Sequence, residues 1–151
     1  MTDLNNKIDA LCQQALQESD PDNHYFYIRD AWRLAHKYKW VSRNAREWGL
    51  DLIDAGADLE SVLELVPPDC QWLMRSNSDE GEEGGFFANV WFPEHTPPVL
   101  LVTDEGCLMH DTTPRFKTYA KTPAMALLIS CLQAWKVVHE AMQVKGDTKN
   151  A

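Results

Sequence analysis

The chain has 151 residues, of which 44% are hydrophobic, and it carries a formal net charge of −9 at pH 7. This length suffices for one domain with a substantial core, and the apolar content, which includes six tryptophans, excludes an intrinsically disordered chain. The negative charge disfavours a general nucleic-acid-binding protein, because contacts with phosphates supply most of the non-specific affinity of such proteins.

Several features of the sequence bear on cellular location. No apolar run approaches the ~18 residues of a membrane-spanning helix, so we expect no membrane contact. The segment MTDLNNKIDALCQQ lacks a basic patch followed by an apolar stretch, and therefore predicts no secretory signal. Four cysteines without short spacings favour free thiols over a disulfide framework. Together these features predict a cytoplasmic protein.

Residues 1–66 show apolar residues at three- and four-residue spacing, which predicts helices separated by turn-forming residues. The expected helices cover residues 3–17, 25–39, 42–55 and 58–65. Ser42 is expected to cap the third helix, Gly56 to end it in a left-handed conformation, and Asp58 to cap the fourth.

The middle of the chain, residues 70–111, has short aromatic or β-branched runs that predict strands joined by close turns. The expected strands cover residues 71–75, 86–92, 99–103 and 107–110, with a further short one at 115–120. In the strongest run, Phe86, Ala88, Val90 and Phe92 alternate with residues that point to the opposite face. Close turns between successive strands favour antiparallel pairing.

A single long helix is expected at residues 122–144, with Thr122 as its N-cap and Pro123 at its first helical position. Its apolar stripe is wide, which implies burial against a broad surface. Five polar residues are assigned to the solvent side: Ser130, Gln133, Lys136, His139 and Glu140. Residues 145–151 are expected to form a frayed tail.

These elements predict a single α+β domain over residues 1–151. An antiparallel sheet of about four strands lies in the middle of the chain and is packed between the N-terminal helices and the C-terminal helix. Both faces of the sheet are expected to need cover, because the run 99–102 is apolar without alternation.

Catalytic and metal-binding motifs are missing from the sequence. No CxxC, HxxxH or HExxH spacing is present, and the nearest pair, Cys107 with His110, supplies only two ligands. Cys107 with His110 or His95 is also the one pairing that could suggest a nucleophile and a base. No glycine pattern suits a phosphate, and the acidic run 79–85 lacks the ligand spacing of a calcium loop. We expect no catalytic residue, no metal and no cofactor.

Charge is distributed unevenly along the chain: residues 51–111 carry −13, while residues 24–50 and 112–151 carry +4 each. An acidic surface can meet a basic protein surface and speed the encounter. The candidate partner-binding residues are the acidic ones, Asp58, Glu60, Glu64, Asp79, Glu80, Glu82 and Glu83. Solubility is the alternative explanation for the same charges.

A basic ridge on the second helix offers a different function, nucleic-acid binding. Its residues, with two from the third helix, are Arg29, Arg33, Lys37, Arg43 and Arg46. A helix-turn-helix is disfavoured, because the helix after Gly56 carries Asp58, Glu60 and Glu64 and would be repelled by the DNA groove. The ridge could still contact phosphate or RNA, or could meet the acidic segments of this chain or of a dimer mate.

The run TYAKTPAMALLISCLQAW, Thr118 to Trp135, follows strands that include VWF. It resembles the closing segment of small phage and prophage proteins described as αβα sandwiches, in which a strand leads into a Thr-Pro-Ala start and an Ala/Leu-rich helix. The resemblance covers residues 86–140, and the helical extension 1–66 departs from it. It implies a phage-encoded accessory protein in a bacterial cytoplasm, and it carries no catalytic residue.

The resulting expectation is a non-enzymatic protein that binds another protein, from the host or the phage, through its acidic surface. If the phage resemblance holds, inhibition of a host defence complex, in the manner of an anti-CRISPR protein, is the specific hypothesis. Homodimerisation is also expected to be possible, because the aromatic run Tyr25, Phe26 and Tyr27 cannot all face one core. Nucleic-acid binding through the basic ridge is the alternative.

Overall fold

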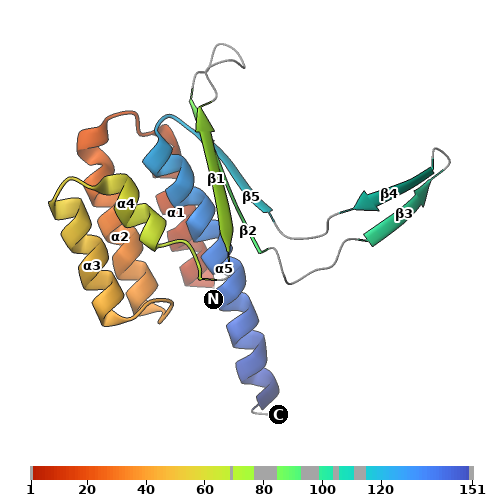
Figure 1. Ribbon diagram of the computed structural model, residues 1–151. Coiled ribbons are helices and arrows are strands. Elements are labelled where there is room, and N and C mark those ends of the chain that lie inside the picture. Colours follow the sequence, from red (N-terminus) through yellow and green to blue (C-terminus); the bar gives the residue numbers. More distant parts are fainter. Residues whose placement is uncertain are drawn as a thin grey trace.

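The computed structural model describes residues 2–68, 70–76, 85–92, 99–103, 106–110 and 115–149, with side chains in 3–68, 70–76, 85–92 and 115–141. The helices are α1 (Thr2–Gln17), the 3-10 turn η1 (Pro21–Asn23), α2 (His24–Lys37), α3 (Arg43–Asp54), α4 (Asp58–Glu64) and α5 (Pro123–Lys149). The strands are β1 (Gln71–Ser76), β2 (Phe86–Trp91), β3 (Val99–Thr103), β4 (Gly106–His110) and β5 (Arg115–Ala120). These elements confirm the α+β class (Figure 1).

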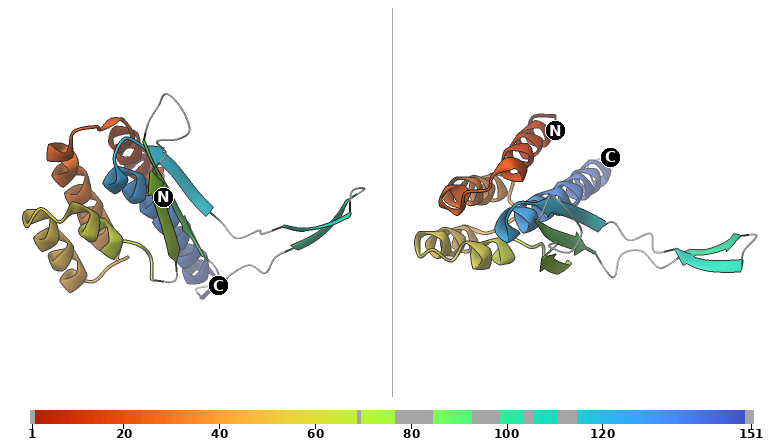
Figure 2. Two further views of the ribbon diagram at one scale, coloured as in Figure 1. Left: turned by 45° about the horizontal axis from the view of Figure 1, so that its top comes forward. Right: turned by 90° about the horizontal axis from the view of Figure 1, so that it is seen from above.

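Helix α5 forms the middle layer of the molecule. It packs against β2 and β5 on one side and against α1, α2 and α4 on the other, as the two views of Figure 2 show. The expected order, with the sheet between the N-terminal helices and the C-terminal helix, is therefore wrong. The sheet is an outer layer, and only one of its faces is covered by α5.

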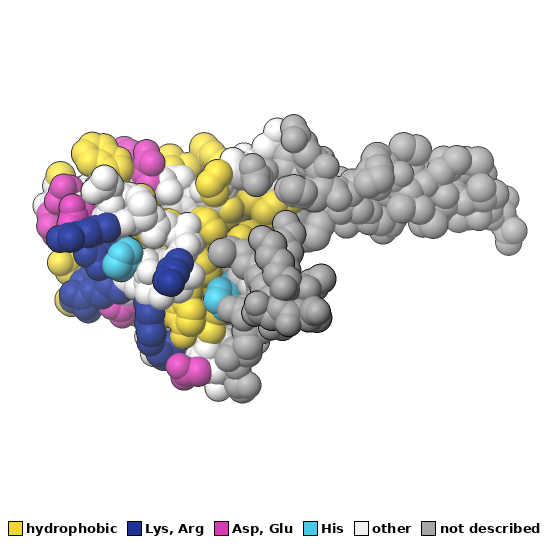
Figure 3. All heavy atoms as spheres, turned by 90° about the horizontal axis from the view of Figure 1, so that it is seen from below, with side chains coloured by type: hydrophobic (Ala, Val, Ile, Leu, Met, Phe, Trp, Pro, Cys, Tyr) yellow, Lys and Arg dark blue, Asp and Glu magenta, His cyan; other side chains and the backbone are white. Residues whose placement is uncertain are grey.

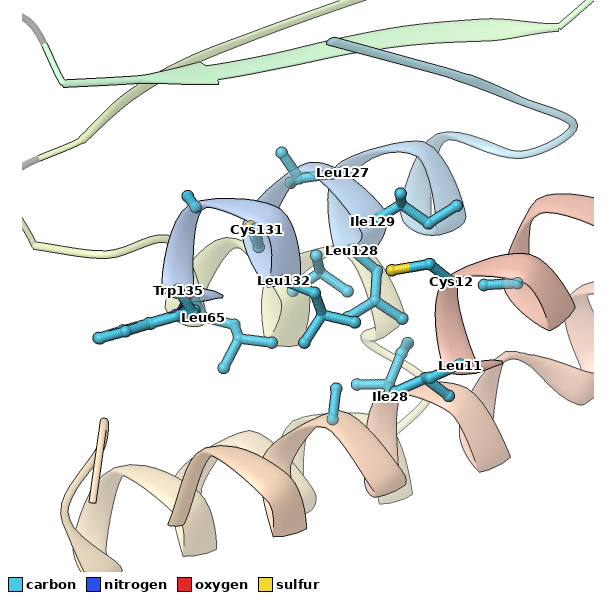
Figure 4. Close-up of a cluster of buried hydrophobic side chains, with 14 of the residues drawn as sticks. Leu11, Cys12, Ile28, Leu65, Leu127, Leu128, Ile129, Cys131, Leu132 and Trp135 are labelled. Carbon is cyan, nitrogen blue, oxygen red and sulfur yellow. Dashed lines mark hydrogen bonds between the residues drawn. The ribbon is translucent and has the colours of Figure 1, made fainter. Parts of the chain in front are cut away.

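The sequence of α5 explains its central position. Every residue from Ala124 to Leu132 is buried, so the helix is apolar around its whole circumference and cannot present a wet side there (Figure 4). Ser130 and His139, which were assigned to solvent, are buried as well. Ser130 is satisfied because its hydroxyl donates to Thr118 Oγ1 at 2.8 Å.

The start of α5 agrees with the prediction, because Thr122 Oγ1 accepts a hydrogen bond from the backbone N–H of Met125 at 3.3 Å. Its end does not agree with the prediction, because the helix continues to Lys149 through most of the expected tail. The N-terminal predictions hold more closely. Ser42 caps α3 by accepting from Ala45 N, and Gly56 has a φ of +81°.

Two buried hydrogen bonds through Ser61 join α2, α3 and α4 in the N-terminal layer. The Trp32 indole N–H donates to Ser61 Oγ at 2.8 Å, and that hydroxyl donates to the carbonyl oxygen of Gly49 at 2.8 Å. Gly49 lies directly against the Trp32 indole, and a Cβ on Gly49 would overlap the ring. The reason for a glycine at this position is the close packing of α2 on α3, and not a turn.

Two stacked tryptophans fix the α2–α3 connection against α5. The rings of Trp40 and Trp135 are 5.5 Å apart and parallel, and Trp40 Nε1 donates to His139 Nδ1 at 3.2 Å. Trp135 Nε1 donates to the carbonyl oxygen of Leu65 at 2.6 Å. Trp40 therefore belongs to the core.

The sheet has three strands in the order β1-β2-β5, all antiparallel. The prediction of about four strands in one sheet is wrong, because β3 and β4 pair only with each other among the described strands. In Figure 1 this hairpin lies away from the three-stranded sheet. The alternation predicted for β2 is confirmed, since Ala88 and Val90 are fully buried toward α5.

Candidate protein-binding face

The face of the sheet that points away from α5 is not covered by any described helix (Figures 1 and 2). Its residues follow from the strand register, because residues directly opposite in paired strands share a face. We call it the outer face, and its side chains are Gln71, Leu73, Arg75, Phe87, Asn89, Trp91, Arg115, Lys117 and Tyr119.

Aromatic rings and guanidinium groups lie together on the outer face. The Arg75 guanidinium lies 5.0 Å from the centre of the Phe87 ring, and the Arg115 guanidinium 5.2 Å from the centre of the Trp91 ring. Tyr119 packs on Phe87 with ring centres 5.0 Å apart. Such cation–π contacts hold a guanidinium group in place over the face of a ring.

Large apolar groups remain exposed on the outer face. Tyr119 is 53% exposed and Leu73 is 45% exposed, on the two strands that flank β2. Aromatic residues and arginine are the types enriched at protein interfaces and at their energetic centres. The composition of this face is therefore that of an interface more than that of an ordinary wet sheet surface.

Asn89 occupies the middle of the outer face, between Leu73 and Lys117 on the flanking strands. It is only 6% exposed, and its Oδ1 atom has no hydrogen-bond partner among the described residues. A buried polar atom without a partner costs about 1–3 kcal/mol. A hydrogen-bond donor brought to this position would remove this cost.

The outer face is positively charged in a protein that is negative overall. Its side chains include Arg75, Arg115 and Lys117 and none of its members is acidic. The sequence already contained a signal for it, because the cations and Tyr119 alternate with buried residues along β5. That signal was missed because β5 was treated as a minor strand.

Three of the seven acidic residues predicted to bind a partner lie among the described residues, and all three are on α4. Asp58 does not cap α4; it is the first residue of that helix, and its carboxylate lies 3.5 Å from His24 Nδ1. Glu60 and Glu64 are exposed on α4. The other four, Asp79, Glu80, Glu82 and Glu83, lie outside the described residues. The acidic-surface hypothesis stays a prediction.

The contact of Asp58 belongs to a buried chain of three polar side chains that the sequence did not reveal. His24 Nε2 lies 2.9 Å from Thr122 Oγ1 on its other side. A carboxylate, an imidazole and a hydroxyl in this order are the parts of a catalytic triad. Here the hydroxyl is buried and already caps α5 through Met125 N, so the arrangement joins the first turns of α2, α4 and α5.

The basic ridge is partly neutralised within the chain. Arg29 bonds to the adjacent Asp30 at 3.3 Å and lies over the rings of Tyr25 and Phe26, both of which are exposed. Arg43 forms an ion pair with Glu47 at 3.1 Å. These two cations therefore have partners among the described residues.

The remaining cations of the ridge differ in exposure. Arg46 is half-buried and lies 3.2 Å from His36 Nδ1, whereas Arg33 and Lys37 are exposed. Figure 3 shows lysine and arginine side chains gathered at this end of the molecule. The neighbouring Lys7 lowers the pKa of Lys37 below its ordinary value. The nucleic-acid hypothesis for this ridge also stays a prediction.

Two of the described cysteines, Cys12 and Cys131, are poor nucleophiles. Burial raises the pKa of the Cys12 thiol to about 11, and burial also raises the pKa of Cys131, so both are protonated thiols at neutral pH. The pairing of Cys107 with His110 or His95 lies outside the described side chains. Within the described residues, no group of three His, Cys, Asp or Glu side chains is placed to hold a metal ion.

Comparison of the chain with protein-family models, with curated proteins and with solved structures gives no match. None of the helices in the described part of the chain has the length and apolarity needed to cross a membrane. The function must therefore be argued from the outer face itself.

Proposed function

We propose that this protein is non-enzymatic and acts by binding another protein through the outer face. The observation that carries the proposal is a sheet face that no described helix covers. On it Leu73 and Tyr119 are exposed around Asn89, whose buried Oδ1 has no hydrogen-bond partner among the described residues. Contiguous apolar surface of this kind is typical of interaction sites in proteins that are otherwise polar outside.

The charge of the outer face defines the chemistry of the partner. Lys117 is exposed on this face and favours a partner surface that presents a carboxylate beside an apolar centre. A backbone or side-chain N–H of the partner donates to Asn89 Oδ1 once water is excluded. The net charge of −9 supports a protein partner over a nucleic acid, because long-range repulsion slows the approach of a polyanion.

The resemblance of residues 86–140 to small phage proteins suggests a partner in a bacterial host. A host defence complex remains the specific hypothesis. The sequence predicted that acidic residues of this protein contact a basic surface of the partner. On the outer face the charges are reversed, because the cation belongs to this protein and the carboxylate to the partner.

A site-specific crosslinking experiment tests the proposal. The photoreactive amino acid benzoylphenylalanine replaces Tyr119, and in a matched control it replaces Trp48, which is 54% exposed on α3 and away from the sheet. In a bacterial cell lysate we expect a discrete protein adduct from position 119 and none from position 48. Arg115→Glu with Lys117→Glu should remove the adduct, whereas Glu60→Gln with Glu64→Gln should not.

The same experiment separates the competing hypotheses. Loss of the adduct in the Glu60/Glu64 variant, with no effect of the Arg115/Lys117 variant, supports the acidic surface instead. An adduct that disappears on nuclease treatment supports a nucleic acid. A gel shift with short DNA and RNA at low salt, repeated with Arg33→Glu and Lys37→Glu, then decides whether the basic ridge is responsible.

A further inference from the structure

Strand β1 lies at one edge of the sheet, and no described strand pairs with its outer side. It pairs with β2, and among the described elements it otherwise packs only against α5. The opposite edge of the sheet is different, because α1 packs beside β5. An edge strand presents unpaired backbone N–H and C=O groups that can pair with another strand.

Two neighbouring residues of β1 show what kind of surface fits this edge. Trp72 and Leu73 point to opposite faces of the sheet, and each is 45% exposed. A helix or loop docked on one face would cover only one of them. A strand that runs alongside β1 reaches both and also satisfies the open backbone groups.

We propose that this strand is β1 of a second copy, paired antiparallel across a two-fold axis at Leu73. In this register Leu73 lies opposite Leu73 of the second copy, Trp72 opposite Met74, and Gln71 opposite Arg75. Each pair joins apolar with apolar groups or an amide with a cation. The one charged residue of β1, Arg75, does not face its own copy.

Edge pairing forms one continuous six-stranded antiparallel sheet in which both outer faces lie on the same side. Leu73 then belongs both to the seam between the two copies and to the outer face.

Sedimentation equilibrium tests the inference, because a residue on the two-fold axis meets itself. We expect a dimer for the natural chain, and for Leu73→Lys and Leu73→Glu separately a dimer Kd raised by at least about tenfold, since like charges face each other. An equimolar mixture of the two variants should recover a dimer, because lysine then faces glutamate. Trp48→Lys, at an exposed site on α3, should leave the dimer unchanged.

Three outcomes would overturn the inference. The natural chain could stay monomeric at all accessible concentrations, Leu73→Lys could dimerise as tightly as the natural chain, or the mixture could fail to recover association. Circular dichroism of each variant confirms that loss of association is not loss of folding; Leu73 is exposed, so both variants are expected to fold.

Discussion

The N-terminal helices and the sheet both pack on α5, but they differ in the hydrogen bonding of their buried polar side chains. In the helical layer, the buried side chains His24, Ser61 and Thr122 are all hydrogen-bonded. On the outer face of the sheet, Asn89 Oδ1 is buried without a hydrogen-bond partner among the described residues, and Leu73 and Tyr119 are exposed. The helical layer also exposes Trp48 and has one such atom, Nε of the half-buried Arg46. The hydrogen bonds of His24, Ser61 and Thr122 stabilise the fold, whereas the unpartnered Oδ1 of Asn89 is the stability that the sheet would give up for the proposed binding surface.

The largest loss of stability is expected at Trp135, on the helix α5 against which both layers pack. Trp135→Ala removes the stacking on Trp40 and leaves the carbonyl oxygen of Leu65 without its donor. Loss of a buried tryptophan lowers the free energy of unfolding by about 3–5 kcal/mol. Urea denaturation measures this, with Trp48→Ala, at an exposed site, as a control that changes stability by less than about 0.5 kcal/mol. Equal effects of the two variants would contradict the central role of α5.

A close contact within the helical layer predicts the next largest effect. Gly49→Ala places a methyl group into the Trp32 indole, and overpacking of this kind costs about 3 kcal/mol. Gly56→Ala is the matched control, because it has open space but a positive φ, which costs only about 1–2 kcal/mol. If Gly56→Ala destabilises the protein more than Gly49→Ala, the helical layer is not tightly packed at Trp32.

Asn89→Leu should change the stability in the opposite direction. It removes the unpartnered amide from the sheet and should raise the free energy of unfolding by about 1 kcal/mol. The crosslinked adduct from position 119 should be lost in the same variant, because the partner then has no acceptor to bind. A destabilised Asn89→Leu variant would show that the amide is needed by the fold and not by a partner.

The smallest effect on stability is expected at Tyr119. Its ring contacts Phe87 but is largely exposed, so Tyr119→Ala should lower the free energy of unfolding by only about 0.5 kcal/mol. Tyr119→Phe keeps the ring and serves as the control. A loss above about 2 kcal/mol would mean that Tyr119 belongs to the core, and the contrast between the layers would fail.

Local sequence chemistry determined most elements of this protein. Ser42, Gly56 and Thr122 mark helix ends through bonds or dihedral angles within a few residues, and all three are where the sequence predicted them. The period-two alternation of β2 likewise placed Ala88 and Val90 on one face of the strand, and the structure shows that this face packs on α5. Such features depend on residues close in sequence, so no tertiary information is needed.

Only the tertiary structure decided how the elements are layered. An α5 that is apolar all round indicates burial but does not say which surfaces cover it, so the sheet was wrongly placed in the middle. The partners of Asp58 and Trp40 come from elements distant in the chain, and their roles could not be inferred from spacing. The outer face exists because strands β1 and β5 flank β2, which brings side chains of three segments onto one surface.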